Sequence, residues 1–336
     1  MANQKAAKEE KKFPTKFASA KLRNYQMLLK NIRLESLYVL GLLIIAMSLL
    51  SPYFLSISNF LNILLATSVI GILAIGSTFV ISSAGLDLSV GSVMGLAGVA
   101  GAVVMNQLHL NWVFGILACI IAGGIAGFFN GQLVTRAKIP AFIVTLGMLG
   151  VARGAALLLC DGKPIYGLSN EFLFLGQGRP FGIPFPVVIF IAVALITHYI
   201  LASTRFGKHT LVIGDNQIAA LAMGINVNRH KVQLYAFSGG LAGLAGMIFT
   251  SRVNAGDPTA GLNYELTAIT AAIIGGTNLF GGKGSILGTF VGALIMGVLQ
   301  NGLNLLAVQS YYQRMAIGAV LILAVWFDQL NRQKNQ

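Results

Sequence analysis

Charged residues are scarce in this sequence. Only 10% of its 336 residues are Asp, Glu, Lys or Arg, whereas a soluble domain carries roughly a quarter. In their place, 56% of the chain is hydrophobic. Many apolar runs reach about 17–23 residues, the length needed to cross ~30 Å of hydrocarbon. This composition excludes an ordinary soluble fold and leaves no room for a sizeable soluble domain.

Cysteine is almost absent. Cys119 and Cys160 are the only two, and each lies within or at the end of an apolar run. Two cysteines so placed give neither a disulfide framework nor the spacing of a metal site. The sequence also lacks a Ser/His/Asp set, a His–Glu metal pattern and a paired-carboxylate cleft. We therefore expect no enzyme activity, no metal and no cofactor held by this chain.

Acidic residues number only 10 against 23 Lys and Arg, which gives a formal net charge of +13. A nucleic-acid binder would interleave basic residues with exposed aromatic ones, and this chain does not. Nine of the basic residues precede residue 35, and most others fall in short segments between apolar runs. Positive residues beside membrane spans mark the cytoplasmic side, so the charge indicates topology rather than nucleic-acid binding.

Ten apolar segments predict an all-α polytopic membrane protein with about ten transmembrane helices, some broken or short. Their approximate ranges are 35–52, 61–83, from the polar break 84–89 to 107, 112–134, 139–160, 185–202, 232–251, 265–280, 285–303 and 312–328. We expect a basic cytosolic tail over 1–34, a membrane domain over 35–328 and a cytosolic tail over 329–336. The even count places both termini in the cytosol and the proline-bearing segment Asp161–Pro184 outside, as an irregular surface loop.

The 40 glycines cluster at spacings of three and four residues along several apolar segments. Such spacings place the glycines on one face of a helix, where they let two helices approach closely in lipid. We interpret these faces as packing surfaces.

A polar island interrupts the apolar pattern between Thr210 and Lys231, within a predicted cytosolic loop over 203–231. Asp215 and Asn216 can cap a short helix at its start, and Gly224 can end it. The exposed apolar side chains of this helix would mark a partner site, and small residues at Ala219 and Ala220 would allow close approach. An ordinary loop helix without a partner is the alternative.

Three polar residues lie where a membrane would surround them. Asp87 follows the second segment and is expected to cap the helix that begins near Leu88, either in a cytosolic turn or at a broken helix facing a cavity. Arg153 and Asn130 lie within apolar segments. A guanidinium there must face the bundle or water, either in a functional role or as the partner of a backbone carbonyl or carboxylate.

The segment Gly275–Ser285 resembles a phosphate loop but fails its pattern. Thr277 stands five residues before Gly282 where glycine is required, and Gly284 follows Lys283 where Ser or Thr is required. Two classes of transporter remain: a subunit driven by a separate ATPase, or a secondary carrier driven by an ion gradient. A carrier would hold several membrane-embedded acids, and only Asp87 qualifies, with Glu265 at an outer edge.

Four blocks of the chain resemble the permease subunits of bacterial ABC sugar importers, of the ribose permease type. The blocks are AGLDLSVGSVMGLAG, IPAFIVTLGMLGVARGAALLL, GDNQIAALAMGINVNRHK and the stretch from DPTAGLNYELTAITAAIIGG to MGVLQNGLNLL. They occur in the family's order, and the resemblance spans about residues 36–328. Asp215 and Gln217 depart from the Gly and Glu that family members often carry at these positions.

The resemblance implies the ABC importer permease fold, in a bacterial inner membrane. Its expected partners are a second permease copy, a cytosolic double-cassette ATPase that binds the ATP, a periplasmic sugar-binding protein and membrane lipid. It implies that the loop docks on the ATPase through Gly214, Asp215, Asn216, Ile218, Ala219, Ala220, Leu221 and Gly224. The family-motif and translocation candidates are Gly85, Asp87, Ser89, Gly91, Asn130, Arg153, Gly281, Gly282 and Lys283. The expected cargo is a monosaccharide or a related polyol.

Overall fold

The computed structural model describes residues 34–334, with side chains described as far as Leu330. The expected basic tail over 1–34 therefore lies almost entirely outside the described residues. The chain forms α3 (Leu34–Leu50), α4 (Ile57–Ser82), α5 (Val90–Asn106), α6 (Trp112–Thr135), α7 (Ala141–Leu159), β1 (Ile165–Tyr166), α8 (Asn170–Gln177), η1 (Pro180–Gly182), α9 (Phe185–Ser203), α10 (Arg205–Asp215), α11 (Gln217–Ala222), α12 (Val227–Val253), β2 (Ala255–Gly256), α13 (Tyr264–Ile274), α14 (Ile286–Leu305) and α15 (Ser310–Lys334). Because α15 continues to Lys334, the expected C-terminal tail is helical as far as that residue.

The predicted apolar segments are confirmed as helices. Seven described helices are long and apolar enough to cross a membrane, and three shorter apolar ones, α3, α5 and α13, complete the ten. The eighth prediction, 265–280, was wrong in length. Helix α13 has only 11 residues, about 17 Å at 1.5 Å per residue, because Gly275 and Gly276, whose φ is +97°, end it.

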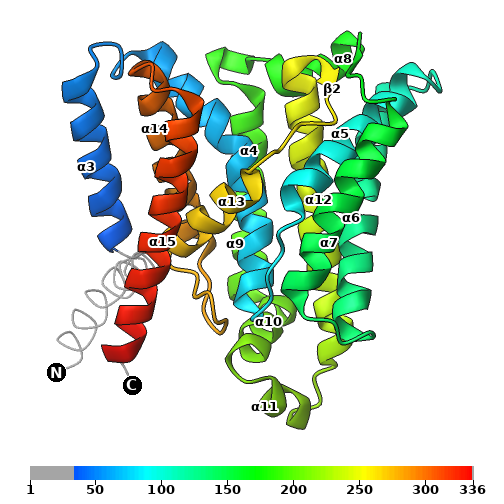
Figure 1. The fold of residues 1–336 in the computed structure, drawn as a ribbon, viewed down its shortest axis with the longest axis vertical. Coiled ribbons are helices and arrows are strands. Elements are labelled where there is room, and N and C mark those ends of the chain that lie inside the picture. The colour runs from blue at the N-terminus through cyan, green and yellow to red at the C-terminus, as the bar shows by residue number, and fades with distance from the viewer. Residues whose placement is uncertain (1–33, 335–336) are drawn as a thin grey trace, which may run out of the picture.

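The helices stand side by side, and their ends gather at two opposite ends of the molecule (Figure 1). At the bottom lies α11, the end of α15 points the same way, and we call this the α11 end. At the top lie α8 and β2, and β1 pairs there with β2, Ile165 opposite Gly256. We call this the β2 end. Helices α4 and α12 form the centre, whereas the membrane-length part of α15 is almost wholly exposed.

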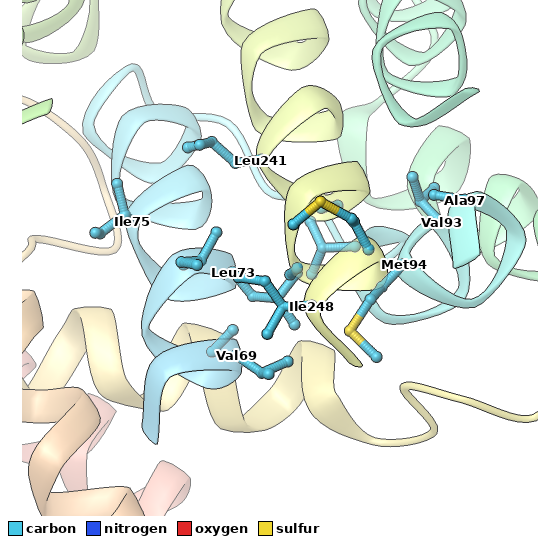
Figure 2. Close-up of a cluster of buried hydrophobic side chains, with 14 of the residues drawn as sticks. Val69, Leu73, Ile75, Val93, Met94, Ala97, Leu241 and Ile248 are labelled. Carbon is cyan, nitrogen blue, oxygen red and sulfur yellow. The ribbon is translucent and has the colours of Figure 1, made fainter. Parts of the chain in front are cut away.

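The centre of the bundle is an apolar cluster shared by α4, α5 and α12. Figure 2 shows Val69 and Leu73 of α4 facing Ile248 of α12, with Met94 of α5 on the other side. All four are almost fully buried. In lipid, such close packing rather than the hydrophobic effect drives helix association, so the cluster fixes the relative positions of these three helices.

The expected glycine faces are real packing surfaces. Helices α6 and α12 meet at Gly127, where a β-carbon would lie 2.1 Å from the carbonyl oxygen of Tyr235. Any larger residue there would force the two backbones apart. The glycine is therefore required for the close approach of α6 and α12.

The segment Asp161–Pro184 is more ordered than the sequence suggested. It contains β1, α8 and η1, and α12 anchors it. The Ser251 hydroxyl donates to the Phe172 carbonyl over 2.6 Å, and Oδ1 of Asn254 accepts from the Leu168 N–H over 3.2 Å. These contacts come from residues about 80 positions away, so local composition did not predict them.

Candidate functional site

The break between α4 and α5 lies inside the bundle. After α4 ends at Ser82, Ala84 takes a φ of +57° and residues 85–89 run outside any helix until α5 begins at Val90. Asp87 is only 2% exposed. Of the two places left open for it, a cytosolic turn and the protein interior, the interior is the one observed.

The Asp87 carboxyl group finds its hydrogen-bond partners locally. Its Oδ1 accepts from the main-chain N–H of Ser89 over 2.9 Å and from the Ser89 hydroxyl over 2.6 Å. Asp87 therefore holds Ser89, the residue that precedes α5, and the expectation that Asp87 itself caps the helix was wrong. The prediction that α5 begins at about Leu88 was early by two residues, because this turn comes first. A buried carboxylate without such donors would be costly.

Side chains from two other helices reach the same break. Nδ2 of Asn130, from α6, donates to the Ser89 hydroxyl over 2.9 Å, and the Tyr235 hydroxyl, from α12, donates to the Leu86 carbonyl over 3.2 Å. We call Asp87, Ser89, Asn130 and Tyr235 the break cluster. It brings together three of the residues singled out from the sequence.

Tyr235 was missed by sequence reasoning. It lies in an apolar segment without a charged neighbour, where an aromatic residue usually signals packing. Its hydroxyl also lies over Gly85, where a β-carbon would come within 2.9 Å of it. Only the three-dimensional contact reveals that Tyr235 and Gly85 belong to one site.

Arg153 lies apart from the break cluster. From α7 it passes Gly95 of α5, and its Nη1 donates to the carbonyls of Pro258 and, over 2.9 Å, of Ala260. The alternative in which Arg153 binds backbone carbonyls is therefore the arrangement observed. Arg153 holds the loop between β2 and α13 against α5.

Gly91 supports the same loop one turn earlier on α5. A β-carbon on Gly91 would lie 2.2 Å from Oε2 of Glu265 and 2.4 Å from the carbonyl oxygen of Gly261. Glu265 lies in the first turn of α13 and is partly buried. Gly91 and Arg153 therefore both serve the packing of the α13 start on α5.

The polar island folds as α10 followed by α11, and the predicted short capped helix is confirmed. Oδ1 of Asn216 accepts from the Ala219 N–H over 3.0 Å, and Gly224 follows the helix with a φ of +78°. Asp215 instead ends α10. The helix α11 is tied to α12 by a 3.0 Å hydrogen bond from Nζ of Lys231 to Oε1 of Gln217.

Helix α11 presents an apolar surface to its surroundings. Ile218 is 80% exposed, Leu221 54% and Met223 62%. The expectation that Ala220 lines a docking surface was wrong, because Ala220 is fully buried against Ile213 and Val227. Ala219, one position earlier, is exposed.

The remaining sequence-selected residues meet at the end of α4. The N–H of Gly282 donates to the Ser82 carbonyl over 3.0 Å, and a β-carbon on Gly214 would lie 1.9 Å from the same oxygen. Gly281 packs against Ala84, and the side chain of Lys283 is exposed. We call Ser82, Gly214 and Gly282 the α4 junction. It joins α10 and the loop 275–285 to the helix that leads into the break cluster.

Comparison with known proteins finds a family of transport permeases and individual permeases that resemble this chain over most of its length. The family described as "Branched-chain amino acid transport system / permease component" matches residues 59–325. The ribose import permease protein RbsC of Haemophilus influenzae is 43% identical, over 91% of this chain and 95% of its own. That of Bacillus subtilis is 44% identical, over 86% and 90%. The D-allose transport system permease protein AlsC of Escherichia coli is 38% identical, over 87% and 90%. No solved structure matches the chain.

Proposed function

The chain belongs to the family of branched-chain amino acid transport system permease components, and we propose that it forms the translocation pathway for a monosaccharide in an ATP-binding cassette importer. The observation that carries this is the 43–44% identity, over nearly the full length of both chains, to permeases named for ribose import. Permeases named for allose and arabinose match over similar lengths. Ribose is therefore the first sugar to test.

A permease of this kind carries out no covalent chemistry, and the energy comes from a partner ATPase. The relatives are import permeases rather than enzymes or ion-driven carriers, which favours this function over the secondary carrier. A periplasmic binding protein delivers the sugar, and a second copy of the chain completes the pathway. A sugar is neutral and rich in hydroxyls, so the pathway needs polar groups rather than strong charge.

We assign α11 as the contact for the ATPase subunit. Its exposed apolar residues, Ile218, Leu221 and Met223, are too few to bury one another, and apolar patches on a soluble surface usually mark partner sites. The Asn216 cap and the Lys231 hydrogen bond hold the helix in one orientation. Because α11 is held in this way, a movement of the bound ATPase subunit would be transmitted through α11 to α12.

The α4 junction supplies a route from α11 to the interior. Helix α10 leads into α11, and its last turn lies against the Ser82 carbonyl at Gly214. Displacement of α10 would therefore move the end of α4. The residues that follow, 83–89, form the break held by Asp87 and Asn130. We infer that ATPase closure reaches the pathway through this sequence of contacts.

We place the α11 end in the cytosol. Among the residues whose side chains are described, the basic residues of that end are Arg136, Lys138, Arg205, Lys208, Arg229, Lys231 and Lys283. Lys163, Arg179, Arg252 and Arg314 lie towards the β2 end. The excess of positive charge supports a cytosolic α11 end, and with it cytosolic termini.

Reconstitution tests the function directly. The permease is placed in liposomes with an ATPase subunit and a sugar-binding protein from the same organism, and uptake of labelled ribose, allose, arabinose and xylose is measured. We expect ATP-dependent uptake of one of these sugars and none under a proton or sodium gradient without the ATPase. Gradient-driven uptake by the permease alone would favour the carrier. ATP-driven uptake of a branched-chain amino acid instead of any sugar would overturn the substrate class.

A further inference from the structure

A cavity of about 610 Å³ opens between α6 and α12 at the α11 end. Two features of sequence create it. The helices touch at Gly127 and again at Gly131, whose β-carbon would lie 2.6 Å from the Cα of Val232. Beyond Gly131 larger residues line the space, Gln132 and Arg136 on one side and Arg229 on the other.

The cavity is positively charged. Arg136 follows the last turn of α6, and Arg229 lies in the first turn of α12. Both are exposed, and among the described residues no acidic side chain lines the cavity. Two guanidinium groups facing one space suit a phosphate group, which accepts hydrogen bonds from both.

Gln132, which lines the cavity, also carries an unpartnered polar atom. Oε1 of Gln132 is buried and, within the described part of the chain, has no hydrogen-bond partner. An amide oxygen can only accept, so a phosphate oxygen cannot satisfy it. A hydroxyl group can, once the Gln132 side chain turns this solvent-inaccessible oxygen toward the cavity. The occupant that satisfies both features carries a phosphate and a hydroxyl.

One wall of the cavity continues into the apolar outer face of α6. Phe128 lines the cavity and is 43% exposed. Ile125 and Ile121, three and seven residues earlier, share its helix face and are 51% and 55% exposed. A free phosphate would use none of this surface. An acyl chain would cover it while its headgroup reached the arginines.

We propose that this cavity binds the headgroup of an anionic phospholipid, phosphatidylglycerol, with its acyl chains along Phe128, Ile125 and Ile121. Its phosphate lies between Arg136 and Arg229, and a glycerol hydroxyl donates to Gln132. Basic pockets between membrane helices on the cytosolic side suit anionic lipid headgroups. The proposal requires only that the α11 end lie at a membrane surface and is independent of the transported sugar.

Native mass spectrometry of the full chain, released from nanodiscs, measures which lipids stay bound. Discs contain phosphatidylethanolamine with either phosphatidylglycerol or phosphatidic acid as a minor component. The variants are R136Q/R229Q and Q132L. The matched control, R205Q/K208Q, removes the same charge from exposed positions of α10 at the same end.

We expect the wild-type chain and the control to retain phosphatidylglycerol over phosphatidylethanolamine. Affinity should fall about fivefold for each arginine lost, and so about 25-fold in R136Q/R229Q. Q132L should lose the preference for phosphatidylglycerol over phosphatidic acid, whose headgroup lacks the glycerol, while still binding both. Retention of both lipids with unchanged preference in Q132L would overturn the assignment of the hydroxyl contact.

Three further results would overturn the proposal. An equal loss of lipid affinity in R205Q/K208Q would mean that the positive charge of this end, not the cavity, attracts the lipid. Displacement of phosphatidylglycerol by inorganic phosphate at comparable concentration would indicate a free-phosphate site. Loss of the bound lipid when the ATPase subunit is added would make that subunit the occupant.

Discussion

The main-chain N–H of Gly282 donates a hydrogen bond of 3.0 Å to the carbonyl oxygen of Ser82. This contact joins two segments 200 residues apart, at the point where α4 gives way to the buried break. Gly282 has a φ of +78°, a region that residues with a side chain rarely adopt. The loop that failed the phosphate-loop pattern therefore has a structural role, because its glycines let its backbone approach α4.

The first prediction concerns the α4 junction. Gly214→Val places side-chain atoms where a β-carbon alone would be 1.9 Å from the Ser82 carbonyl, so we expect a loss of about 1–3 kcal/mol in stability and a marked loss of uptake. Uptake and thermal unfolding in detergent measure the effect. Gly154→Val, at a position where a β-carbon meets nothing within 4 Å, is the matched control. Normal uptake by Gly214→Val would remove the junction from the coupling route.

The second prediction concerns docking. Ile218→Glu places a charge on the most exposed apolar side chain of α11 and should weaken ATPase binding about 30-fold or more, as loss of a central interface residue does. The free energy of unfolding of the permease itself should stay within about 0.5 kcal/mol of the wild-type value, because the site is exposed. Co-purification of the ATPase measures the first effect, with Lys208→Gln as control.

Ala220→Glu gives the contrasting result. Because Ala220 is fully buried beside Ile213 and Val227, a carboxylate there should destabilise the α10–α11 segment before any partner binds. Yield and thermal stability of the isolated permease should fall. A stable Ala220→Glu variant that still loses the ATPase would mean that α11 turns its other face to the partner.

The third prediction concerns Asp87. Asp87→Asn keeps an acceptor oxygen for the two Ser89 donors, whereas Asp87→Leu leaves both without a partner. Each buried donor left unsatisfied costs about 1–3 kcal/mol, so the Leu variant should unfold at a lower temperature than the Asn variant. Thermal unfolding in one detergent compares them. Equal stability of the Leu variant and the wild type would contradict this reading of the break.

The fourth prediction concerns Arg153. Arg153→Leu removes the donor from the carbonyls of Pro258 and Ala260, at a cost of about 1.5–3 kcal/mol for hydrogen bonds to a charged group. Hydrogen exchange over residues 257–263 should quicken at least about tenfold. Arg153→Lys should be intermediate, because an ammonium does not replace a guanidinium fork. Arg179 is exposed near the same end, and Arg179→Leu should leave hydrogen exchange over residues 257–263 unchanged.

The fifth prediction concerns orientation. After Cys119 and Cys160 are replaced, a cysteine at Lys163 should react with a membrane-impermeant thiol reagent in intact cells. One at Gln217 should react only after the membrane is opened. Both positions are exposed, so access depends on the side of the membrane. The reverse pattern would place the α11 end outside.

The sequence was most informative where physics is local. The ten predicted apolar runs contain apolar helices, and seven of these are long enough to cross hydrocarbon, because a long apolar run is visible in composition. The cap at Asn216 and the stop at Gly224 were likewise predictable, since a helix end needs only its nearest neighbours. The early end of α13 was missed although Gly275 and Gly276 mark it, because apolar residues lie close on both sides.

The sequence was least informative where distant segments meet. Asp87, Ser89 and Asn130 were chosen as separate candidates, and nothing in their spacing placed them in one cluster. Tyr235 was not chosen, because its hydroxyl gains a role only when α12 packs against the break. The burial of Ala220 depends on Val227, beyond the end of α11. Such contacts depend on how helices pack, which a single sequence does not show.

Helix α12 is one unbroken helix of 27 residues, about 40 Å long at 1.5 Å per residue. It begins beside α11, contacts the break through Tyr235, and ends just before β2, which pairs with β1. Both faces of the permease are therefore attached to one stiff element. If α12 has two positions, any partner that prefers one of them at the α11 end alters affinity at the β2 end. Linkage then requires an equal effect in return. The sugar-loaded binding protein at one end must change the binding affinity of the ATPase at the other end by the same factor.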